Sequence, residues 1–81
     1  MPIYRVRLFA TLRDLAGREA LDLTLPADAT VGQLRAALAT LPGLQPYAES
    51  AVIAVNHAFT TDDTPLTPND EIAAFPPVSG G

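Results

Sequence analysis

LDLTLPADATVGQLRAALATL, residues 21–41, changes its hydrophobic period halfway along. Leucines alternate with polar residues at first, which predicts a strand over residues 19–25 that ends at Pro26. Thr30 can then cap a helix, and Gln33 completes the pattern of a capping box. The apolar residues that follow recur at helical spacing: Val31, Leu34, Leu38 and Leu41. The stretch therefore predicts a strand followed at once by the main helix, whose apolar stripe belongs to the core.

Strands are expected on both sides of this unit. Residues 3–9 alternate, so that one face of that strand points into the core and Phe9 lies on the other. The apolar run over residues 51–55 predicts a buried strand, followed by a turn at Asn56-His57 and a short return strand over residues 58–60. Residues 71–75 form the last strand, with Phe75 on the face opposite Ile72 and Ala74. These strands supply a sheet for the helix to cover.

The remaining segments are expected to be short or irregular. Residues 11–16 suit a short helical turn that stops at Gly17. Residues 44–50 contain Pro46 and are predicted to be an irregular crossing that packs through Leu44 or Tyr47.

This order of elements predicts the α+β class, with one main helix packed across a mixed sheet of about five strands. A β-grasp arrangement satisfies the order, with the N-terminal hairpin and the final strand pairing at the centre of the sheet. We expect a single domain over residues 1–75 and a C-terminal arm over residues 76–81, mobile in the free protein and ordered in a partner.

The composition excludes several kinds of site. The 81 residues include no cysteine, so thiolate metal sites and thiol catalysis are excluded, and any sulfur chemistry must use sulfur brought from elsewhere. His57 is the only imidazole, so no metal site is expected and His57 is assigned no role. A net charge of -4 makes nucleic acid an unsuitable partner and favours a basic protein surface. The sequence has no apolar run of signal-peptide or membrane-spanning type, and the protein is expected in the cytoplasm.

The last residues are the candidate for chemistry. Pro76 and Pro77 favour an extended course, and Val78, Ser79 and Gly80 continue it to Gly81. Two glycines lack Cβ atoms, so the end can pass through a narrow channel and present the carboxylate of Gly81 inside a partner's active site. At the root of this arm, Phe9, Phe59 and Phe75 are predicted to be exposed or half exposed and to form an apolar docking patch.

Several motifs resemble those of the MoaD-type small, sulfur-carrying subunits of molybdopterin synthase, within the wider ubiquitin-like family. The matching stretches are residues 8–10, 13–17, 30–31, 55–56, 65–67, 69–72 and, above all, Phe75-Pro76-Pro77-Val78-Ser79-Gly80-Gly81. The resemblance implies that a ubiquitin-activating-like adenylyltransferase uses ATP to adenylate Gly81. A sulfur donor protein then converts the adenylate to a thiocarboxylate.

The same resemblance implies that the large subunit of molybdopterin synthase takes the arm and builds the dithiolene of molybdopterin from a pterin precursor. The large subunit supplies the catalytic side chains, and this chain is its sulfur-donating, non-catalytic subunit that binds no cofactor itself.

Two other functions stay open at this point. Carriers for thiamine synthesis or tRNA thiolation, and ubiquitin-like protein modifiers, share the Gly-Gly end. A ubiquitin-like binding module whose tail is never activated belongs to a different class. Removing Gly81 leaves the binding of such a module intact but abolishes the function of a carrier.

Overall fold

The last strand of the chain, β5 (Ile72–Phe75), lies at the centre of the protein's sheet. The computed structural model describes residues 2–77 and contains the elements β1 (Ile3–Leu8), α1 (Ala10–Ala16), β2 (Ala20–Thr24), α2 (Val31–Leu38), α3 (Gln45–Ala48), β3 (Val52–Val55), β4 (Ala58–Phe59) and β5. The strands form one five-stranded sheet in the order β2-β1-β5-β3-β4. The predictions for residues 78–81 lie outside the described residues, and the boundary between domain and arm stays a prediction.

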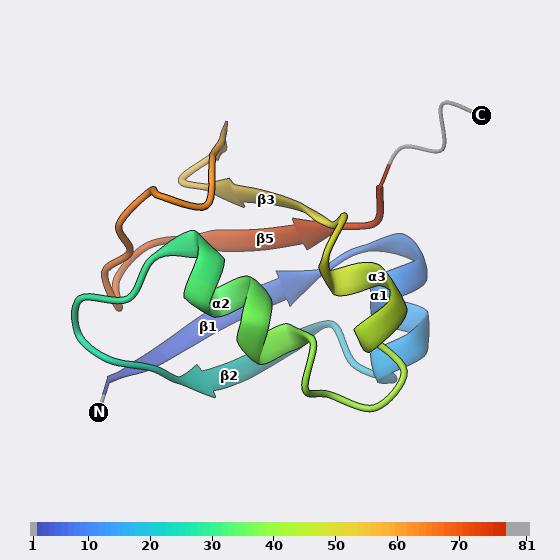
Figure 1. Ribbon diagram of the computed structural model, residues 1–81. Coiled ribbons are helices and arrows are strands. Elements are labelled where there is room, and N and C mark those ends of the chain that lie inside the picture. The colour runs from blue at the N-terminus through green and yellow to red at the C-terminus, as the bar shows by residue number, and fades with distance from the viewer. Residues whose placement is uncertain (1, 78–81) are drawn as a thin grey trace.

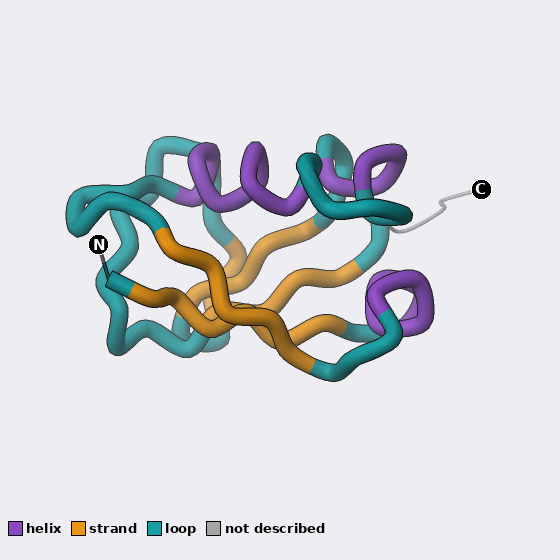
Figure 2. The backbone as a smooth tube through the Cα atoms, turned by 90° about the horizontal axis from the view of Figure 1, so that it is seen from below, coloured by secondary structure: helices purple, strands orange, loops and turns teal. Residues whose placement is uncertain are grey.

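The sheet is mixed. β1 pairs in parallel with β5, while β1–β2, β3–β5 and β3–β4 are antiparallel. α2 crosses one face of the sheet, with α3 beside it, whereas α1 lies near the end of β1 (Figure 1). Figure 2 shows α2 and α3 in one layer above the strands. The predicted β-grasp arrangement, with the N-terminal hairpin and the last strand at the centre, is confirmed.

The buried face of the sheet follows the predicted alternation. Tyr4, Val6 and Leu8 of β1 are buried, as are Ile72 and Ala74 of β5. The core continues into the apolar stripe of α2, where the buried side chains are Val31, Leu34 and Leu38. The aliphatic core therefore lies between the sheet and α2.

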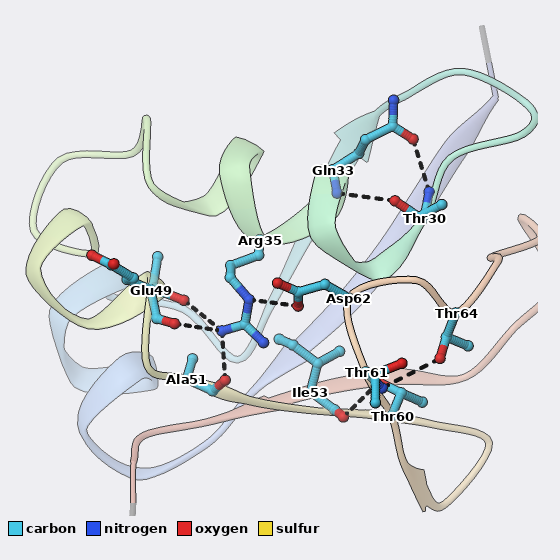
Figure 3. Close-up of polar contacts among 11 residues, drawn as sticks. Thr30, Gln33, Arg35, Glu49, Ala51, Ile53, Thr60, Thr61, Asp62 and Thr64 are labelled. Carbon is cyan, nitrogen blue, oxygen red and sulfur yellow. Dashed lines mark hydrogen bonds and ion pairs between the residues drawn. The ribbon is translucent and has the colours of Figure 1, made fainter.

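The predicted capping box begins α2 (Figure 3). The Thr30 hydroxyl accepts a hydrogen bond from the Gln33 amide at 3.4 Å, and the Gln33 side chain accepts one from the Thr30 amide at 2.9 Å. The helix ends at Leu38, earlier than the apolar spacing predicts. Leu41 is half-buried and packs against the core from the turns after the helix.

The prediction of an irregular crossing over residues 44–50 is wrong. Residues Gln45–Ala48 form α3, and Pro46 lies in its first turn. Proline is tolerated there because the first amides of a helix have no partner within the helix. Of the two predicted packing residues, Leu44 is buried and Tyr47 is exposed.

Arg35 of α2 connects three segments of the chain, a role that the sequence did not reveal (Figure 3). Its Nη1 lies 2.8 Å from the carbonyl oxygen of Ala48, 3.1 Å from that of Glu49 and 2.7 Å from that of Ala51. Its Nε donates to Asp62 at 3.0 Å. One guanidinium thus satisfies carbonyls at the end of α3 and holds the 61–64 loop against α2.

Two turns contain residues in the left-handed region of the backbone, with positive φ. Asn56 and His57 both have positive φ, 53° and 70°, which is the conformation of the tight turn that suits a two-residue hairpin. The predicted turn and return strand are therefore confirmed. Gly17 ends α1 in the left-handed region at φ 74°.

Candidate functional site

The face of the sheet opposite α2 carries the three predicted phenylalanines. Phe59 is 79% exposed, while Phe9 and Phe75 are half-buried. The rings of Phe9 and Phe75 stack, with centroids 4.7 Å apart and planes 13° from parallel. We call Phe9, Phe59 and Phe75 the aromatic patch. Their predicted exposure is confirmed, and their role in docking stays a prediction.

The strand register brings the three rings to one face. Phe75 lies opposite Val52 of β3, and Phe59 lies opposite Ala54, which is two residues further along the same strand. Directly opposite residues of an antiparallel pair point to the same side of the sheet. Phe9 follows β1 directly, and its amide donates to the carbonyl of Ala74 at 3.2 Å. Three segments far apart in the sequence therefore meet in the patch.

A hollow of about 260 Å³ lies beside the aromatic patch. The small side chains of Ala54 and Ala73, which are opposite each other on β3 and β5, leave room for it. The other residues that line it are Arg7, Phe9, His57, Phe59, Glu71 and Phe75. One part of its wall is thus aromatic and another is charged, an arrangement that fits a protruding partner side chain better than a small polar ligand.

The side chains of His57 and Glu71 are in contact in the charged part of this wall. His57 Nε2 lies 2.9 Å from Glu71 Oε2, and both side chains are largely exposed. The sequence assigned His57 no role, and the structure places it at the rim of the hollow. Within residues 2–77, no group of three His, Cys, Asp or Glu side chains is placed to hold a metal ion.

The root of the predicted arm lies in an open groove of about 660 Å³. Pro76 and Pro77 line this groove together with Ala10, Val52, Phe59 and Phe75. Both prolines are half-buried. The structure therefore brings the first two arm residues into contact with the surface that bears the aromatic patch. Val78, Ser79, Gly80 and Gly81, the other predicted site residues, lie outside the described residues.

Sequence reasoning assigned no role to the small residues beneath the patch. Ala54 and Ala73 lie on the outer face of the sheet, although Ala54 is 8% exposed because its neighbours cover it. Side chains alternate between the two faces of the sheet along β3 and β5, and this alternation identifies which residues point outward once the register between the strands is known. The register itself depends on pairing between distant strands.

No helix in the described part of the chain has the length and apolar content needed to cross a membrane.

A family model described as the ThiS family matches residues 6–81. The molybdopterin synthase sulfur carrier subunit of Arabidopsis thaliana is 36% identical over 78 residues, which cover 95% of this chain and 81% of that protein. Small archaeal modifier protein 1 of Haloferax volcanii is 36% identical over 87 residues, covering 93% of this chain and 97% of that protein.

A solved structure shares both the fold and part of the sequence. It is the complex of subunits 1 and 2 of the molybdopterin-converting factor from Helicobacter pylori. The matching chain superposes with a TM-score of 0.68 and is 30% identical, covering 98% of this chain and 99% of that chain. The β-grasp fold of this chain is therefore shared with proteins named as sulfur carriers and as protein modifiers.

Proposed function

This chain belongs to the ThiS family, and on that premise we propose that it is a sulfur carrier for molybdenum cofactor synthesis. The single observation that carries the proposal is similarity, over 95% of the chain, to a molybdopterin synthase sulfur carrier subunit. The family model also matches through Gly81, so the Gly-Gly end is part of the likeness.

Gly81 is the residue that carries the sulfur in this proposal. A carboxylate is a poor electrophile, and attack of its oxygen on the α-phosphate of ATP gives an acyl-adenylate and releases pyrophosphate. Hydrosulfide released by a donor protein then attacks the acyl carbon and displaces AMP, which leaves a thiocarboxylate with one sulfur in place of one oxygen. ATP is bound by the activating adenylyltransferase, and this chain holds no cofactor.

A large synthase subunit is the proposed acceptor of the sulfur. The Helicobacter pylori structure contains both subunits of its converting factor, which supports a two-subunit assembly for this chain as well. In our proposal the aromatic patch docks on the large subunit, while residues 76–81 enter its active site. The thiocarboxylate sulfur is transferred to a pterin precursor over two cycles to form the dithiolene.

Geometry supports this division of roles. Two residues of the patch share one groove with the root of the arm, so a partner that covers Phe59 and Phe75 also meets Pro76 and Pro77. Docking can then fix the position of the root of the arm on the partner. An extended segment of fixed length that starts there reaches a defined depth in the partner's active site.

The direct test is intact mass measurement after incubation with the activating enzyme, ATP and a sulfur source. We expect a mass gain of one oxygen-to-sulfur exchange, located at Gly81. The matched control is the chain that lacks Gly81, which should fold with the same melting temperature and gain no mass. No exchange with a demonstrably active enzyme from the same organism would contradict the carrier function and favour a binding module.

A protein modifier is the second candidate, favoured by the 36% identity to small archaeal modifier protein 1. The same activated Gly81 would then form an amide with a lysine of another protein. An epitope-tagged chain expressed in its own organism tests this, because a modifier gives a ladder of larger conjugates that disappears when Gly81 is deleted. A carrier alone gives only the free chain and its non-covalent complexes.

A further inference from the structure

Two arginines of β1, Arg5 and Arg7, lie on the open face of the sheet. They alternate with the buried residues Tyr4, Val6 and Leu8. Arg5 lies opposite Asp22 of β2, and its Nε is 3.2 Å from Asp22 Oδ1. The charge of Arg5 is therefore matched within the sheet.

Arg7 has different neighbours. Alanines lie directly opposite it on both adjacent strands, Ala20 on β2 and Ala73 on β5. Within residues 2–77, its guanidinium forms no ion pair. Instead it lies over the ring of Phe9, 5.6 Å from the centroid, within the range of a cation–π contact.

The position of Arg7 places this unmatched charge at the edge of the aromatic patch. Its guanidinium, the Phe9 ring and the Phe75 ring follow one another across the open face. Arg7 also lines the hollow beside the patch, where the carboxylate of Glu71 is already paired with His57 at 2.9 Å. A partner that covers the patch must therefore approach a cation held in place by a ring.

We propose that Arg7 is a specificity-determining residue of this docking surface and pairs with a carboxylate of the large subunit. The proposal rests on the proposed function, because it takes the large subunit as the partner. Once a partner covers the patch, an unpaired Arg7 loses water and gains nothing in return. A carboxylate opposite Arg7 removes that penalty, whereas a basic or apolar group there is disfavoured, which is how a charge at the edge of a patch discriminates between partners.

The charge of Arg7 is opposite in sign to the net charge of the chain, and this difference restricts which partner surfaces fit. The net charge is -4, so the protein as a whole attracts a basic surface. Arg7 requires the opposite sign at one point beside the patch. A partner that satisfies both conditions can bind the open face in one orientation only. The position of the root of the arm relative to that partner is then fixed as well.

Arg7→Gln and Arg5→Gln form a matched pair for the test, since both arginines are exposed on the same face of the same strand. The affinity of each variant for the purified large subunit is measured by calorimetry at low and at high salt. We expect Arg7→Gln to bind roughly three- to tenfold more weakly at low salt, with a smaller difference at high salt. Arg5→Gln should stay within about twofold of the unsubstituted chain because its ion pair is internal and exposed. Equal effects of the two substitutions would overturn the proposal.

Thiocarboxylate formation by the activating enzyme is measured on the same samples by intact mass. If the unsubstituted chain neither accepts sulfur nor binds the large subunit, the proposed function fails. If it does both and Arg7→Gln binds the large subunit unchanged, only the role of Arg7 fails. Slower thiocarboxylation of Arg7→Gln with unchanged binding would assign Arg7 to the activating enzyme, which also overturns the proposal.

Discussion

Arg35 is the residue whose loss should most affect the stability of the chain outside the apolar core. Its side chain is 19% exposed, and it donates to Asp62 and to two partly buried carbonyl oxygens, one in the last residue of α3 and one just after α3. Removing it takes a donor from these carbonyls of Ala48 and Ala51, and the Ala48 carbonyl keeps the Ala51 amide at 3.4 Å. We expect Arg35→Ala to lower the free energy of unfolding by about 2–3 kcal/mol, measured by urea denaturation.

Arg5→Ala is the control for Arg35→Ala, because it removes an exposed arginine and one exposed ion pair. Its effect should stay below about 1 kcal/mol. Equal losses for the two variants would show that the contacts of Arg35 add nothing beyond surface charge.

The ionisation of Asp70 should make the free energy of unfolding depend on pH in the acidic range. The amide of Thr67 donates to its carboxylate at 2.8 Å and is the main reason that its pKa lies below the ordinary 3.8, while Asn56 Nδ2 donates to it at 3.0 Å. A lowered folded-state pKa means that this stabilisation is present above the pKa of the unfolded chain. It is lost as the pH falls through the folded-state pKa.

We expect Asp70→Asn to lower stability by roughly 1 kcal/mol at neutral pH. The difference from the unsubstituted chain should shrink below about pH 4, as Asp70 becomes protonated. Denaturation curves recorded from neutral to acidic pH test this. A constant difference across that range would mean that ionisation of Asp70 does not contribute.

At the scale of single elements, β4 should serve binding more than folding. It has two residues at the edge of the sheet, and the ring of Phe59 is 79% exposed. We expect Phe59→Ala to leave the melting temperature within a few degrees and to weaken binding to the large subunit about tenfold. Phe75→Ala should weaken binding too, with some loss of stability because it removes a stacked ring. A Phe75→Ala variant that fails to fold would contradict a docking role for Phe75.

The elements that the sequence predicted best are those with a local signal. Alternation gave the inward faces of β1 and β5, and the capping box placed the start of α2 at Thr30. α3 was missed because Pro46 was interpreted as a breaker, although proline suits the first turn of a helix. The end of α2 was misplaced because Leu41 has helical spacing yet packs from a turn.

The candidate site was predictable in part for the same reason. Strand parity pointed Phe9 and Phe75 outward, and both lie on the open face. The stack between their rings and the contact of His57 with Glu71 join segments distant in sequence. Such contacts depend on strand order and register, which no local pattern encodes.

For the molecule as a whole, the parallel contact between β1 and β5 should decide whether the domain folds. Ala74 is fully buried opposite Leu8, while its neighbour Ala73 faces the open side. We expect Ala74→Asp to cost at least about 3 kcal/mol because it buries a charge, whereas Ala73→Asp should fold with a much smaller loss. Circular dichroism melting curves of the two variants provide the comparison. Similar curves would show that the two faces of β5 are not different in burial.

Because β5 lies at the centre of the sheet, the domain can fold only if the chain is intact through its last strand. Residues near position 6 find their partners near position 72, so the sheet cannot close around β3 and β4 until the last strand arrives. A chain that a protease has cut before Ile72 loses the middle of its sheet rather than an edge, and it exposes apolar surface that quality-control proteases degrade. The folded population is thereby restricted to chains that still possess the strand leading into residues 76–81, so a partner that selects the folded surface meets chains that are intact at least through Phe75.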